Sequence, residues 1–178
     1  MTEKRESSLF VFGCYHKLQR FGAAFLDLAE QNRHEDQQKL FGRTLAEIFL
    51  KEQITFLAEE IGYAQPSLAR CLAHVFMRPY LVIEMPLAER VRVGCRPDYE
   101  TLLRINGPNE DAVLRCHEVR EQYMAHRIME LAGEKDRGLI LCGVTHANRL
   151  KQRLQETFTE VKLITLLDYD WFDRNLYG

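Results

Sequence analysis

The stretch Leu9-Phe10-Val11-Phe12-Gly13-Cys14-Tyr15-His16 has a counterpart near the other end of the chain, Leu139-Ile140-Leu141-Cys142-Gly143-Val144-Thr145-His146. In both, an apolar run typical of a strand buried on both faces leads into the pattern Gly-x-x-His. A segment with helical periodicity follows each. Loops at the carboxyl ends of strands in an α/β sheet are where ligands and chemistry collect. We therefore expect His16 and His146 to face each other across one cleft.

Strand-like and helix-like periods alternate along the rest of the chain. The periodicity predicts further strands at 53–58, 80–84 and 161–167, and helices at 18–29, 36–51, 66–76, 108–132 and 147–158. This alternation favours an α/β fold, with a mostly parallel sheet of about five strands and helices on both faces. A length of 178 residues suits one domain, so we interpret residues 1–178 as a single α/β domain.

Composition and charge argue against several classes of function. A net charge of −2, well mixed along the chain, gives no electrostatic reason for binding nucleic acid or an anionic membrane surface. The sequence has no signal-type hydrophobic region and no apolar run approaching the ~20 residues of a membrane span. Five cysteines without a Cys-x-x-Cys pair indicate reduced thiols, and hence a cytoplasmic protein.

Two adjacent carboxylates, Glu59 and Glu60, follow the second predicted strand. If both are buried, like charges raise the pKa of one of them. One glutamate could then act as a general base or metal ligand while the other pairs with an arginine. The alternative is a solvated loop; the position at the histidines' edge of the sheet supports the functional interpretation equally.

The long predicted helix adds Arg120 and Glu121 to the candidate residues. Arg120 lies at the apolar side of the helix, and Glu121 shares a stripe with His117 and Met124. Arginine at such a place can clamp a carboxylate or an anionic substrate. We expect the histidines outside the two Gly-x-x-His motifs to be ordinary surface or satisfied residues; these are His34, His74, His117 and His126.

Taken together, these motifs make the chain resemble the superfamily that joins erythromycin esterases, ChaN-type haem-binding proteins, TraB/PrgY proteins and TIKI proteases. The resemblance spans about Leu9 to Leu167 and follows the family's order. It implies an active cleft with two histidines, acidic residues and an arginine. Members hydrolyse ester or peptide bonds, some with a metal, and others bind haem. Cys14 stands where the esterases usually carry glutamate, which argues against a macrolide substrate.

The leading interpretation is a hydrolase acting on a small molecule or peptide. Its candidate catalytic residues are His16, His146, Glu59, Glu60, Arg120 and Glu121. His16 and His146, completed by Glu60, would bind a divalent metal such as Zn, Mn or Fe, or the histidines would act as acid and base. Arg120 would orient a carboxylate or stabilise developing negative charge.

Three alternatives remain open at the level of the sequence. The same cleft could hold a small molecule, a metal or haem without turnover. The chain could be a subunit of a stress or defence assembly or a homo-oligomer, with the arginine-bearing region Val91–Arg104 as a contact surface. Cys14 could be a nucleophile if His16 or His146 activated its thiol.

Overall fold

The computed structural model describes residues 4–20, 28–61, 66–95 and 110–176. In this part of the chain five strands form one parallel sheet with the order β3-β2-β4-β1-β5. The strands are β1 (Arg5–Cys14), β2 (Phe56–Glu59), β3 (Tyr80–Val82), β4 (Arg137–Gly143) and β5 (Phe158–Thr165). The predicted α/β class is therefore confirmed.

Helices connect these strands. They are α1 (His16–Gln19), α2 (Leu28–Lys51), α3 (Leu68–Val75), α4 (Leu87–Arg92), α6 (Glu110–Leu131) and α7 (Val144–Leu154), followed by the 3-10 turns η1 (Leu166–Asp168) and η2 (Arg174–Leu176). Among these helices, none combines the length and apolarity needed to cross a membrane.

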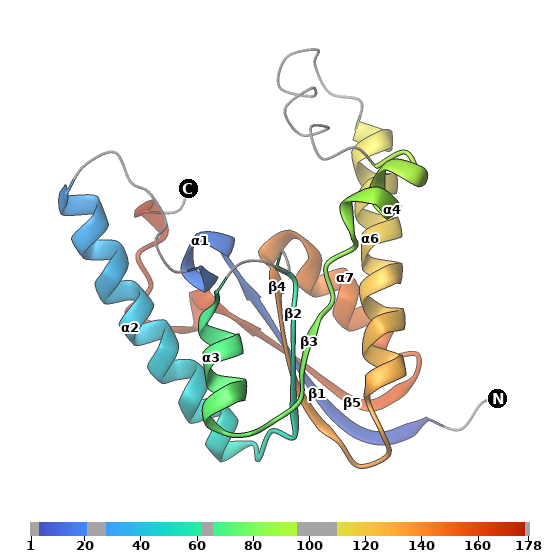
Figure 1. Ribbon diagram of the computed structural model, residues 1–178, viewed down its shortest axis with the longest axis horizontal. Helices are drawn as coiled ribbons and strands as arrows, with labels where there is room; N and C mark the ends of the chain where they lie inside the picture. The colour runs from blue at the N-terminus through green and yellow to red at the C-terminus, as the bar shows by residue number, and fades with distance from the viewer. Residues whose placement is uncertain (1–3, 21–27, 62–65, 96–109, 177–178) are drawn as a thin grey trace.

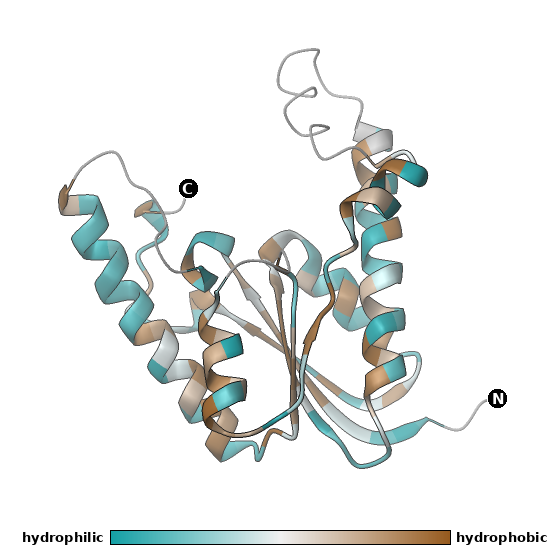
Figure 2. Ribbon diagram, viewed as in Figure 1, coloured by the Kyte–Doolittle hydropathy of each residue, from teal (hydrophilic) through white to brown (hydrophobic). Residues whose placement is uncertain are grey.

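The two faces of the sheet carry separate hydrophobic cores. Helices α2 and α3 cover one face, and α6 and α7 cover the other (Figure 1). Successive side chains of a strand point to opposite faces, so Phe10 packs in the core under α2 while Leu9 and Val11 pack under α6 and α7. Figure 2 shows largely hydrophobic strands at the centre and mostly hydrophilic residues along much of α2. Burial on both faces explains why the strand sequences are continuously apolar.

The strand order brings the two Gly-x-x-His motifs side by side. The chain passes from β1 through β2 to β3 and then returns, so β4 lies between β2 and β1. In the parallel register of β1 and β4, Gly13 is paired with Cys142, and Cys14 with Gly143. The loops after β1, β2 and β4 therefore meet at one edge, at a reversal of strand order where α/β proteins commonly bind ligands.

Element boundaries differ from the expectation at several places. The last predicted helix extended to Phe158, but α7 ends at Leu154 and Phe158 begins β5, where it is paired with Arg5. That pairing with a distant strand has no signal in the local sequence. The predicted helix 18–29 falls partly, and the region Val91–Arg104 mostly, outside the described residues.

Candidate functional site

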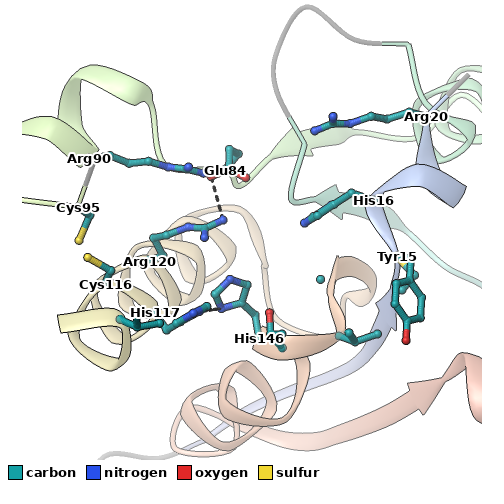
Figure 3. Close-up of a pocket in the computed structure, with 15 residues that line it drawn as sticks. Tyr15, His16, Arg20, Glu84, Arg90, Cys95, Cys116, His117, Arg120 and His146 are labelled. Carbon is teal, nitrogen blue, oxygen red and sulfur yellow. Dashed lines mark hydrogen bonds and ion pairs between the residues drawn. The ribbon is translucent and has the colours of Figure 1, made fainter. Parts of the chain in front are cut away.

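A cavity of about 470 Å³ opens at the carboxyl ends of the strands. Its lining includes His16, Arg20, Glu84, His117, Arg120 and His146 (Figure 3). The two histidines of the Gly-x-x-His motifs thus face one cavity, as the sequence predicts, together with Arg120. Glu60 and Glu121 are fully buried behind it. The chemical roles assigned to these residues stay predictions.

Each motif's glycine makes room for the other motif. A Cβ atom on Gly143 would lie 3.1 Å from Nε2 of His16 and 3.5 Å from Oε2 of Glu60. A Cβ atom on Gly13 would lie 2.9 Å from Cβ of Ala147, on the helix that carries His146. Glycine at both positions therefore allows the His16 ring and helix α7 to approach the sheet edge closely.

Glu60 is held as a buried carboxylate. Its Oε1 accepts a hydrogen bond from Arg120 at 2.5 Å, and its Oε2 accepts one from the backbone N–H of Gly143 at 2.8 Å. Nε2 of His146 lies 3.5 Å from the same Oε1. Burial alone raises the pKa of Glu60, but the charges of His146, Arg120 and His16 and the Gly143 N–H outweigh it and lower that pKa. Glu60 is therefore ionised, with both oxygens engaged.

Glu59 points to the opposite face of the sheet and has a different environment. Its Oε2 accepts hydrogen bonds from Ser67 at 2.5 Å and from Tyr80 at 2.6 Å. Burial raises its pKa, and the hydrogen bonds from Ser67 and Tyr80 and the charge of Arg20 only partly offset this. The two adjacent glutamates thus have pKa values shifted in opposite directions. Burial on the far side of β2, rather than mutual repulsion, raises the pKa of Glu59.

Gln19 holds the ring of His16 through one hydrogen bond. Oε1 of Gln19 lies 2.6 Å from Nδ1 of His16 and acts as the acceptor, so this bond places a proton on Nδ1. Gln19 is fully buried, and its Nε2 has no hydrogen-bond partner among the described residues. In the neutral form of His16 this bond would leave Nε2 without a proton, near Gly143 at the cavity wall. This arrangement suits a base that faces the cavity.

The structure brings together His117, Glu121 and His146 as a candidate metal cluster. One ligating atom from each lies within 4.8 Å of the other two. Nδ1 of His146 is 3.1 Å from Oε1 of Glu121 and 3.5 Å from Nδ1 of His117. Glu121 and His146 are buried, and the second oxygen of Glu121 has no hydrogen-bond partner among the described residues. A buried carboxylate oxygen in this state is suited to a cation.

His117 is the residue that the sequence interpretation passed over. It lies one helical turn before Glu121 on α6, so the two side chains project from the same side of the helix. That spacing was visible in the sequence, but the third member, His146, comes from a distant helix. His16 and Glu60, predicted as ligands with His146, are not members of this cluster. Their assignment as metal ligands stays a prediction.

Glu84, which follows β3 and lines the cavity, forms ion pairs with two arginines. Arg120 on α6 lies 3.4 Å from its Oε1, and Arg90 on α4 contacts the same oxygen. Arg120 therefore bridges Glu84 and Glu60. Figure 3 shows its contact with Glu84. Neither Glu84 nor Arg90 lies in a motif, which is why the sequence did not single them out.

Cys14 does not have the environment of an activated nucleophile. Its thiol is fully buried, and its Sγ lies 3.6 Å from the carbonyl oxygen of Cys142. Burial, reinforced by Cys142, Glu59 and Glu60, raises the pKa of Cys14 well above its ordinary value. The thiol therefore remains protonated, whereas a nucleophilic cysteine needs a lowered pKa.

Comparisons with protein-family models, with curated proteins and with solved structures returned no match for this chain. The physical features of the cavity therefore carry the assignment of function.

Proposed function

We propose that the protein is a hydrolase that uses a divalent metal ion held by His117, Glu121 and His146. The observation that carries this proposal is the cluster itself, three ligating groups from two helices beside a cavity at the sheet edge. Metal–ligand bonds of about 2.1 Å in tetrahedral geometry separate neighbouring ligand atoms by about 3.4 Å. The separations of 3.1 and 3.5 Å measured from Nδ1 of His146 agree with that spacing.

The surroundings of His146 also support this assignment. With Nδ1 directed at the metal position, Nε2 would carry the proton and face Glu60, 3.5 Å away. A carboxylate behind a ligating histidine fixes the ring and its tautomer in many metal sites. Arg120 and the Gly143 N–H hold Glu60 in place for this role. Two histidines and one carboxylate with open positions suit Zn, Mn or Fe(II).

The remaining residues have roles in hydrolysis that follow from their positions. A bound metal would lower the pKa of a water molecule and polarise the bond to be broken. Nε2 of His16, across the cavity, would take a proton from the attacking water and return it to the leaving group. Arg120 would stabilise the negative charge that develops on the substrate. The water oxygen forms the new bond as the bond to the leaving group breaks.

We also retain, as a proposal, the relationship to the superfamily of erythromycin esterases, ChaN-type, TraB/PrgY and TIKI proteins. It rests on the order of the four motifs along the chain, which ends with Gly143-Val144-Thr145-His146. The hydrolase assignment stands on the cluster and does not depend on this relationship.

Metal analysis of purified protein tests the proposal. After incubation with Zn²⁺, Mn²⁺ or Fe²⁺ and gel filtration, we expect about one ion per chain for the wild type and little for His117→Ala. His126→Ala is the matched control, because His126 is an exposed histidine on the same helix, paired with Glu130. A full complement of metal in His117→Ala, or none in the wild type, would refute the site.

Activity is tested separately on a panel of ester, amide and phosphate substrates. We expect hydrolysis by the metal-loaded protein, loss with a chelator, and recovery when the metal is restored. His16→Gln should retain metal but lose most of the turnover rate. Metal binding without hydrolysis of any substrate would instead favour the alternative of a binding protein without turnover.

A further inference from the structure

Three arginines from three different elements line the cavity: Arg20 after α1, Arg90 on α4 and Arg120 on α6. Two of them are neutralised by carboxylates on the same wall. Arg90 is paired with Glu84, and Arg120 with both Glu84 and Glu60. These two arginines are therefore largely occupied by groups of the protein.

Arg20 is different. Within the described part of the chain, its guanidinium makes no hydrogen bond or ion pair, and its Nε is buried without a partner. Its charge acts on buried Glu59 only as a through-space interaction. Figure 3 shows the side chain extending above His16 toward the cavity.

The backbone of Arg20 is fixed although its side chain is unpaired. Its carbonyl oxygen accepts a hydrogen bond from Nε2 of Gln38 at 2.5 Å, and Arg20 forms an antiparallel bridge with Ser67. A cation held by its backbone at a cavity wall, without an internal counter-charge in contact, is suited to an anion from solution.

The first turn of α7 supplies a second favourable feature for an anion. Gly143, Val144 and Thr145 line the cavity; the N-cap residue Gly143 has no side chain to cap the first turn, and its own N–H is donated to Glu60. Helix N-termini carry partial positive charge and free N–H groups that bind phosphate and carboxylate. This feature adds to the charge of Arg20 in the same cavity.

We propose that this cavity binds a phosphate monoester, with Arg20 as the residue that contacts the phosphate group. This inference rests on the proposed function, because it names the substrate class of the same site. A phosphate monoester carries nearly two charges and three oxygen atoms free to accept hydrogen bonds, more than a carboxylate offers. Arg20, a metal held by His117, Glu121 and His146, and the N–H groups at the N-terminus of α7 would together contact those three oxygen atoms.

The reaction would then be phosphate-ester hydrolysis. A water oxygen forms a bond to phosphorus as the bond between phosphorus and the ester oxygen breaks. The ester oxygen leaves as an alcohol after taking the proton that the water lost, and inorganic phosphate is the second product. Cationic groups placed on the phosphoryl oxygens stabilise the charge in such a transition state.

Calorimetric titration of metal-free protein with inorganic phosphate tests the binding step. We expect saturable binding by the wild type, and binding about tenfold weaker or more for Arg20→Gln, because one charge-assisted contact is lost. Arg43→Gln is the matched control, since Arg43 is exposed on α2 and does not line the cavity; it should bind phosphate like the wild type. Equal affinity of Arg20→Gln and the wild type for phosphate would overturn the inference, as would acetate binding as tight as phosphate binding.

Turnover gives the second readout. With metal-loaded protein and p-nitrophenyl phosphate, Arg20→Gln should raise KM about tenfold with a smaller effect on kcat. Hydrolysis of p-nitrophenyl acetate with none of the phosphate ester would overturn the substrate class and leave the proposed hydrolase standing. Phosphate binding that depends on Arg20 in a protein that takes up no metal would support the anion site and refute the metal centre.

Discussion

Replacing Arg120 with methionine would remove the main cationic partner of a carboxylate that has no exposure to solvent. Glu60 is 0% exposed, and the Arg120 side chain is 15% exposed. Methionine keeps much of the length and apolar surface of arginine but supplies no charge and no N–H donor. The substitution therefore isolates the electrostatic part of the Arg120–Glu60 interaction.

The expected loss of stability follows from burial. Removing one partner of a buried ion pair costs about 3–5 kcal/mol, because the remaining charge is left uncompensated. Glu60 still accepts the Gly143 N–H at 2.8 Å and lies near His146, so we expect the lower end, about 3 kcal/mol. For a chain of 178 residues this corresponds to a fall in Tm of roughly 6–12 °C.

Urea denaturation of metal-free protein measures this loss, and a double variant tests its cause. Arg120→Met with Glu60→Gln removes both charges, and we expect it to recover most of the lost stability. Arg127→Met is the control on the same helix; Arg127 pairs with Glu130 at the surface, so its loss should cost under about 1 kcal/mol. A double variant as unstable as Arg120→Met alone would refute the reasoning.

Three further predictions concern the backbone at the sheet edge and the second glutamate. Gly143→Ala should displace the His16 ring, because the new Cβ would lie 3.1 Å from Nε2 of His16, and the imidazole NMR signals of His16 should shift. Gly42→Ala is the control, because its Cβ would lie 3.7 Å from Cδ2 of Leu68, an ordinary contact distance, and it should leave those signals unchanged. Gly138→Ala places a Cβ 2.2 Å from Cζ of Phe56 and should destabilise the fold by about 3 kcal/mol or more in urea denaturation. Folding raises the pKa of Glu59, so its contribution to the free energy of unfolding is present at acid pH and is lost as pH rises through the raised value. The free energy of unfolding of the wild type, relative to that of Glu59→Gln, should therefore decline as pH increases from acid to neutral. Tyr80 and Arg20, which face Glu59, are unchanged in both proteins. An opposite slope would contradict a raised pKa for Glu59.

The sequence alone determined the class of fold and the sheet edge at which the candidate site lies. The apolar runs 9–12 and 139–142 lead into Gly-x-x-His motifs, and parallel strands place such loops at the same edge. Because periodicity and turn residues are local properties, they could be detected without knowledge of the partner strands. His16 and His146 were identified in this way, and Arg120 from its place on the long predicted helix; all three line one cavity.

Only the tertiary structure decided which side chains of the site touch. The insertion of β4 between β1 and β2 sets Gly143 beside Glu60, and the packing of α6 against α7 sets His117 beside His146. The opposite pKa shifts of Glu59 and Glu60 likewise depend on the partners that surround each side chain on its own side of the sheet. Contacts of this kind join residues far apart in the chain, and their energies depend on burial and on partner charges that appear only when the distant elements pack together.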